Sequence, residues 1–203
     1  WLPDFVYGGM DGAVTTFAIV AGVGGSKLSA GIILILGFAN LIADGFSMAI
    51  GKFMSDRAQL EQIWNSRSTE ENDILKNPKF EKNMVERILK KRGVPPEKIS
   101  EIVDLIQEHP DTWVDVLTAH EMRVARGAIN PVKGGLSTFA AFIIIGFIPL
   151  AAYVFTPVLG LDEDQAFILA SASTLVALFI IGVVKTRFTD GFWLWKGLET
   201  AFI

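Results

Sequence analysis

Cysteine is absent from the 203 residues, and histidine occurs only twice. Without thiols the chain can form neither a disulfide nor a thiolate metal centre, so oxygen, imidazole and thioether are the only metal ligands it offers. The sequence also lacks a basic stripe, because its 18 Lys and Arg residues are mixed with 22 Asp and Glu residues, for a formal charge of −4. This balance argues against nucleic acid as a partner.

Motifs of hydrolytic and nucleotide chemistry are missing too. His120-Glu121 begins like a zinc protease motif, but Val124 stands where the second histidine is required. No serine in the apolar stretches has an evident base, so catalysis finds little support. The glycines between Gly22 and Gly25 lie at the end of an apolar stretch, where they indicate a turn. We expect neither an enzyme nor a prosthetic group.

Long apolar runs dominate the sequence instead. Hydrophobic residues make up 51% of the chain, and the mean hydropathy is +0.42. Crossing a bilayer takes about 20 apolar residues, and four runs reach that length: 5–26, 28–50, 134–161 and 165–184. Pro149 predicts a kink in the third run. A fifth span is expected to begin near Lys196 and to be cut short where the sequence stops.

Most of the charged residues lie between the second and third runs. We therefore predict an all-α, polytopic transmembrane helix bundle interrupted by one helical insert. Spans one and two occupy 1–51, the insert 52–129, and spans three, four and the start of five 130–203. Within the insert, apolar residues at helical spacing predict helices around 80–89 and 99–106 and a further helix after Asp111.

Lys and Arg are unevenly distributed between the loops. They are frequent in the insert and around Lys185 and Arg187, whereas the 162–164 loop has none, and Lys27 is the one exception. The positive-inside bias therefore places the amino terminus and the insert in the cytosol. The protein is expected in a bacterial-type cytoplasmic membrane or a vacuolar membrane.

Acidic residues inside the apolar runs are candidate functional groups, because charge is costly in a bilayer. Asp11 is the only charge in the first run, with Thr15 one turn later. On the second run Asn40, Asp44 and Met48 recur every fourth residue and share one helix face. Oxygen with thioether suits a borderline cation such as Fe²⁺ better than Mg²⁺ or Ca²⁺. The alternative is that Met48 only packs and Asp44 bonds to another helix.

A second acidic stripe lies in the insert. Its members follow helical spacing, opposite an Ile/Val face: Glu97, Glu101, Asp104 and Glu108. Like charges at these spacings repel unless a cation relieves them. The stripe is either a metal site or a solvated outer face, and the spacing does not decide between the two.

Several segments together resemble the vacuolar iron transporter family. They are Asp11-Gly-Ala-Val-Thr-Thr-Phe-Ala18, Ala43-Asp-Gly-Phe-Ser-Met-Ala-Ile-Gly51, the helix break at Lys91-Arg-Gly93 and Asn130-Pro131 before the third span. The resemblance implies a five-span homodimer with a path near the dimer axis and a cytosolic metal-binding domain between spans two and three. It also implies that Fe²⁺, and often Mn²⁺, leaves the cytosol in exchange for protons.

The resemblance carries over residue by residue. Asp11 and Met48 match the family's pore aspartate and methionine, whereas Asn40 stands where the family commonly has a glutamate. Asp44, one turn on, could supply that carboxylate, which is our inference and not the family pattern. In the insert, the resemblance implies that Glu70, Glu71 and Glu81 are the metal ligands on the first two helices. Met84 stands where the family has a second glutamate on the second helix. The candidates for the third helix are Glu101, Asp104 and Glu108.

Two functions remain open on the sequence. The first is a metal transporter that works with a lipid bilayer, a second copy of itself, divalent ions and protons. The second is a membrane-embedded metal sensor or scaffold that moves nothing. Neither the preferred metal nor the role of the insert, regulatory or metal-delivering, follows from the residues.

Overall fold

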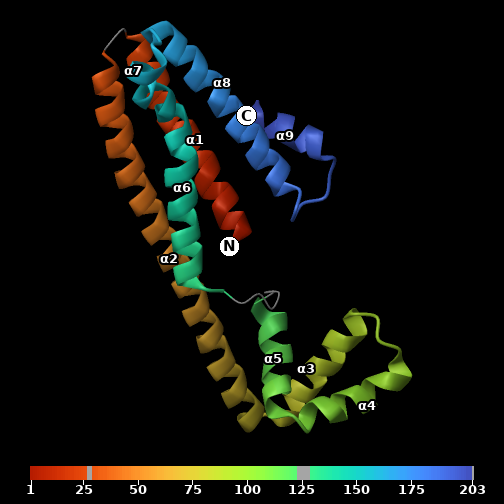
Figure 1. Cartoon of the computed structure of the whole chain (residues 1–203). Coiled ribbons are helices and arrows are strands. Elements are labelled where there is room, and N and C mark those ends of the chain that lie inside the picture. Colours follow the sequence, from red (N-terminus) through yellow and green to blue (C-terminus); the bar gives the residue numbers. More distant parts are fainter. Residues whose placement is uncertain (27–28, 123–128, 203) are drawn as a thin grey trace. The chain divides into compact units, whose positions relative to one another are not determined.

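The structure is a computed structural model that describes residues 1–26, 29–122 and 129–202. Throughout these ranges the regular elements are helices (Figure 1). Their bounds are α1 Leu2–Gly25, α2 Ala30–Lys76, α3 Pro78–Lys91, α4 Pro96–Gln107, α5 Pro110–Met122, α6 Pro131–Val154, α7 Thr156–Leu159, α8 Glu163–Lys185 and α9 Trp193–Ala201. The prediction of an all-α fold is confirmed.

The chain divides into two compact units. The membrane unit comprises Trp1–Ser55 and Asn130–Ile203, and the insert unit comprises Asp56–Ile129. Among the described residues, four helices are long and apolar enough to cross a membrane, namely α1, α2, α6 and α8. They correspond to the four runs found in the sequence, except that the third of them, α6, ends at Val154, before the short α7, and not at position 161. The predicted helical membrane bundle is confirmed.

Helix α2 differs from the sequence expectation in length. It runs for 47 residues without a break, so its first part belongs to the membrane unit and its second part to the insert unit. The sequence marks the polarity change near Lys52 but has no Gly-Pro stop there. A helix that leaves a bilayer can continue in water, because its backbone hydrogen bonds are internal to it.

Glycines set the contact between α1 and α6 in the membrane unit. A Cβ on Gly8 would lie 2.5 Å from the carbonyl oxygen of Thr138, and one on Gly12 equally close to that of Phe142. The two backbones therefore touch, as small residues allow in membrane helices. Around them α1, α2, α6 and α8 bury a cluster that includes Val20, Leu41, Phe142, Leu150 and Ala170.

Substituting Gly12 with alanine should loosen this contact. A methyl group cannot coexist with the Phe142 carbonyl at 2.5 Å, so the helices must separate, and we expect a loss of about 2 kcal/mol or more. Gly22→Ala, on the same helix with nothing within 4 Å, should be neutral or stabilising by up to about 1 kcal/mol. Thermal unfolding in detergent measures both. Equal melting temperatures for the two variants would contradict the close packing.

Three short helices and the end of α2 form the insert unit. Val85, Ile88, Val103, Trp113 and Leu117 are buried together, with Ile74 of α2 packed against them. Gly93 ends the α3 segment with a φ of 81°, which favours glycine. Pro96 and Pro110 then open α4 and α5 at positions where proline is tolerated.

Candidate metal sites

A hydrogen-bonded link joins α1 and α2 in the middle of the membrane unit. The Asn40 amide donates to Thr15 Oγ1 at 3.4 Å, and Thr15 Oγ1 donates to the Asp11 carbonyl oxygen at 2.8 Å. The sequence places Asp11 and Thr15 on one helix and Asn40 on another, and these two hydrogen bonds connect them. Asn40 supplies an uncharged carboxamide here, so the acidic function rests on its neighbours.

Asp11 and Asp44 are the acids of this site. Their carboxylates are close enough to interact electrostatically. In the described part of the chain neither carboxylate accepts a hydrogen bond or forms an ion pair. Asp11 is half-buried, whereas Asp44 is exposed on α2. Two unneutralised carboxylates in an apolar bundle are a place where a cation or a proton is favoured.

The surroundings of Asp44 are apolar and also exposed. Ile42, Phe46 and Ile50 lie on the same stretch of α2 and are 64%, 60% and 44% exposed. A lone carboxylate facing lipid costs about 3 kcal/mol or more at a helix centre. Asp44 is thus an exposed acid on an otherwise apolar face of α2.

Met48 has a different environment from Asp44. It is partly buried and packs against the apolar cluster formed by α1, α2, α6 and α8. Within one copy of the chain Met48 therefore has a packing role, which was the alternative interpretation of this residue. A thioether at the edge of a core remains flexible enough to reach a neighbouring ion.

A second acidic site lies in the insert unit, where three helices meet. Glu70 and Asp73 come from α2, Glu81 from α3 and Glu121 from α5. Glu81 is only 7% exposed, and no hydrogen-bond donor or cation reaches its carboxylate within the described residues. Ser66 donates a hydrogen bond of 2.6 Å to Glu121. We call these four carboxylates the acidic cluster.

Burial and mutual repulsion change the acidity of the cluster. Burial raises the pKa of Glu70 to about 7, helped by the charges of Glu81, Glu121 and Asp73 and by a hydrogen bond with Glu121. Burial and the charge of Asp73 also raise the pKa of Glu81. As they stand, no three acids or histidines of the described residues lie close enough to share one ion. Binding one cation through three of these carboxylates therefore requires their side chains to move closer together.

The raised pKa of Glu70 predicts how the stability of the metal-free insert depends on pH. Between about 4.5 and 7 the folded state holds a proton that the unfolded state releases, so stability falls as pH rises through this window and is flat above it. The shift corresponds to about 3 kcal/mol, and solvent screening reduces our expectation to about 1–2 kcal/mol. Backbone hydrogen exchange of α3–α5 in the full chain at pH 5.0 and 7.5, corrected for intrinsic rates, measures this.

Two glutamine variants serve as the comparison for this pH effect. Glu70→Gln should lose most of the pH dependence, while Glu71→Gln, at an exposed neighbouring position, should keep it. Equal protection of the wild-type chain at both pH values would show that Glu70 titrates normally.

The other insert candidates lie outside the acidic cluster. Asp104 pairs with Lys82 at 2.9 Å and Glu101 with Lys98 at 3.0 Å, on the surface of α4. Glu71 and Glu108 are exposed. Met84 is partly buried against Val85 and its apolar neighbours. Of the candidates named from the sequence, the structure brings Glu70 and Glu81 together.

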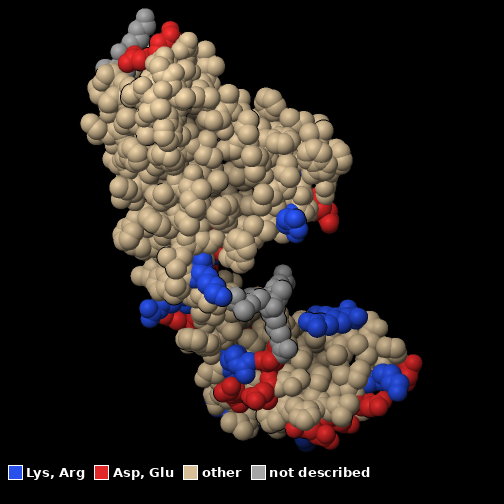
Figure 2. All heavy atoms as spheres, viewed as in Figure 1, with Lys and Arg blue, Asp and Glu red and all other residues tan. Residues whose placement is uncertain are grey.

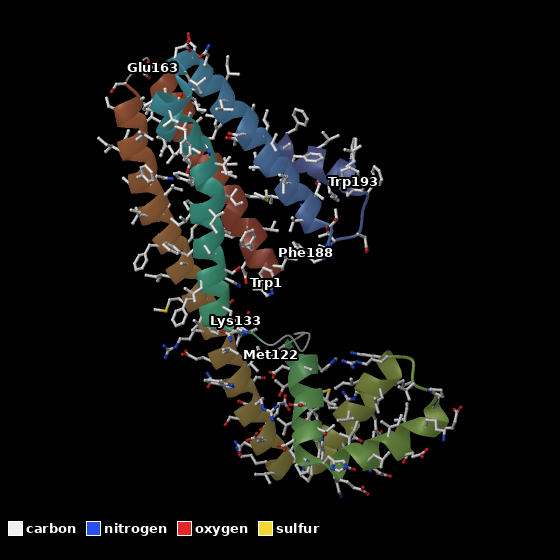
Figure 3. All side chains as sticks on the ribbon, viewed as in Figure 1. Trp1, Met122, Lys133, Glu163, Phe188 and Trp193 are labelled. Carbon is white, nitrogen blue, oxygen red and sulfur yellow. The ribbon has the colours of Figure 1, made fainter. Side chains whose placement is uncertain are left out.

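Glu121 and Met122 were missed as candidates by the sequence reasoning, and Asp73 was not ranked as one. A cavity of about 500 Å³ is lined by Ser66, Glu121, Met122 and two glutamines of α2. Met122 lies at the end of α5, beside Glu121 (Figure 3). Carboxylate and thioether together suit a borderline divalent cation. The available signal was the i, i+3 spacing of Glu70 and Asp73; nothing local points to Glu121, which was set aside with the broken zinc motif.

Comparison with known proteins identifies the family of the chain. The model of the VIT family matches residues 2–203. A vacuolar iron transporter of Toxoplasma gondii is 34% identical over 90% of this chain, which spans 63% of that protein. Vacuolar iron transporter 1 of Arabidopsis thaliana is 30% identical over 98% of this chain, covering 79% of the relative. The resemblance seen in the sequence is confirmed, and the chain belongs to the VIT family.

Proposed function

We propose that this protein transports a divalent metal, Fe²⁺ and also Mn²⁺, out of the cytosol in exchange for protons. The observation that carries the proposal is the pair Asp11 and Asp44, two acids without hydrogen-bonded or ionic partners in the described chain, within the apolar runs 5–26 and 28–50. A carboxylate in such a place can hold a proton or share a metal ion, but not both at once. Alternate occupation by the two cations is proton-coupled exchange.

The uncovered face of α2 supports a homodimer as the working unit. A second copy packed over Asp44 and its apolar neighbours would remove the acid from lipid and place two copies of Asp11, Asp44 and Met48 around one path. Doubling by symmetry supplies enough ligands for a coordination sphere from a few residues per chain. Asn40 then contributes an amide oxygen or holds Thr15 in place.

The insert would be the cytosolic collector in this mechanism. Its acidic cluster binds metal through Glu70, Glu81 and Glu121 and raises the local concentration of the ion near the membrane. The relatives are named iron transporters, and this supports iron as the cargo. The cargo passes through unchanged, so the protein needs no catalytic residue.

Flux into liposomes tests the proposal. The full-length protein is reconstituted, and uptake of Fe²⁺, Mn²⁺ and Zn²⁺ is followed with and without a pH gradient. We expect Fe²⁺ and Mn²⁺ uptake that rises with the opposing proton gradient and acidifies the donor side. Metal binding without flux under either condition would instead support the sensor or scaffold.

A further inference from the structure

Four basic residues gather at the end of α3 and are not used by the proposed transport mechanism. Arg87, Lys90, Lys91 and Arg92 are all exposed, and no acid occurs between positions 87 and 96. Figure 2 shows Lys and Arg side chains as a blue patch in this region of the insert. We call these four residues the basic corner.

The basic corner, like Lys76 and Lys79 but unlike four other cations of the insert, has no acidic partner among the described residues. Arg57, Arg67, Lys82 and Lys98 each form an ion pair. In the described parts of the chain no such pair involves the four residues of the corner. The negative end of the α3 dipole favours a cation or two in the last turn. Four cations together are more than the helix dipole explains, and the net charge of the whole chain is −4.

A groove beside the corner offers further hydrogen-bond donors. It has a volume of about 520 Å³ between α3 and α4, and Arg87, Lys90, Asn83 and Ser100 line it together with one acid, Glu86. Guanidinium, ammonium, amide and hydroxyl groups are the donors that hold phosphate oxygens in proteins. The chemistry of the corner and groove therefore fits an anionic phosphate group.

We propose that the basic corner binds the anionic headgroups of phospholipids. The insert is tied to membrane-spanning helices at both ends, because α2 continues into it and α6 begins nine residues after α5. A tethered module meets headgroups at a high effective concentration, so a few charges suffice. A long polyanion such as nucleic acid fits poorly, since it would also meet the acidic residues elsewhere in the insert.

The strength of the attraction follows from the number of charges. Each Lys or Arg near an anionic leaflet changes the partition by about fivefold, and the effect is screened within a Debye length of about 10 Å at 0.1 M salt. Removing two of the four charges should therefore weaken docking by roughly tenfold or more. The proposal does not depend on metal transport, because it concerns a surface separate from the acidic cluster and can be tested without metal.

Energy transfer in nanodiscs tests the docking directly. Because the chain has no cysteine, Thr112→Cys provides a single labelling site at an exposed position of the insert outside the groove. A donor dye there is combined with an acceptor on the lipid headgroups, in discs of phosphatidylcholine alone or with 30% phosphatidylserine. We expect higher transfer in the anionic discs, lost at 0.5 M NaCl.

A matched pair of variants separates the corner from total charge. Lys90→Gln/Lys91→Gln should remove the gain in anionic discs, whereas Lys76→Gln/Lys79→Gln, an equal change at exposed positions of the same insert, should keep it. Equal transfer in both lipids, or equal losses in both variants, would overturn the proposal. Displacement by 10 mM inorganic phosphate at constant ionic strength would overturn it too, in favour of a site for free phosphate.

Discussion

Asp11→Asn is expected to lower metal flux by at least about 100-fold in reconstituted liposomes while the bundle stays folded. An amide keeps the size of the side chain but can neither release a proton nor neutralise a divalent ion. Loss of outer-shell partners alone typically costs 10–100-fold in metal affinity, so loss of a direct ligand should cost at least the upper value. Neutralising an acid in an apolar helix also removes a desolvation cost, so folding should not suffer.

The flux assay needs two comparison variants. Asp190→Asn makes the same change at an exposed position between α8 and α9 and should leave flux within about twofold, as surface changes usually do. Asp44→Asn tests our own inference that this residue replaces the carboxylate missing at position 40, and it should resemble Asp11→Asn. Wild-type flux in Asp11→Asn would rule out the carboxylate pair as the exchange site.

Glu81→Gln is expected to have opposite effects on the stability of the insert with and without metal. Glu81 lies in the first turn of α3, where the helix dipole favours a carboxylate by about 0.3–1 kcal/mol. Its pKa is nevertheless raised, so burial and the charge of Asp73 outweigh the dipole. Without metal the variant should therefore be more stable, by about 1 kcal/mol.

With metal bound, the wild-type chain should be more stable than Glu81→Gln. A ligand at 100 times its dissociation constant stabilises the folded state by about 2.7 kcal/mol. The wild-type chain should gain that amount with Fe²⁺ or Mn²⁺, and Glu81→Gln should gain little because the buried ligand is gone. Thermal unfolding of the full chain with and without metal gives both numbers.

Glu101→Gln is the control for the acidic cluster. This carboxylate is exposed and paired with Lys98, so its removal should change neither the metal-free stability nor the gain with metal by more than about 0.5 kcal/mol. If Glu101→Gln lost the metal effect while Glu81→Gln kept it, the acidic stripe on α4 would be the metal site and the cluster would not.

The spans and their acids could be predicted from the sequence because their signals are local. A run of about 20 apolar residues is readable without neighbours, and Asp11 and Asp44 stand out within such runs as single charges. The insert helices were equally visible, since Gly93, Pro95 and Pro110 separate them. The length of α2 could not be predicted, because no residue near Lys52 either stops a helix or requires one to continue.

The acidic cluster was decided by tertiary structure. Glu101 and Asp104 carry the same charge as Glu81 and Glu121, and spacing along the chain ranks them equally as ligands. Packing of α3 and α5 against α2 buries Glu81 and brings Glu121 to Glu70, while α4 turns its acids toward lysines and solvent. Sequence alone determined where charge enters an apolar helix, and only the fold decided which charges in the insert meet, because that depends on contacts between residues far apart in the chain.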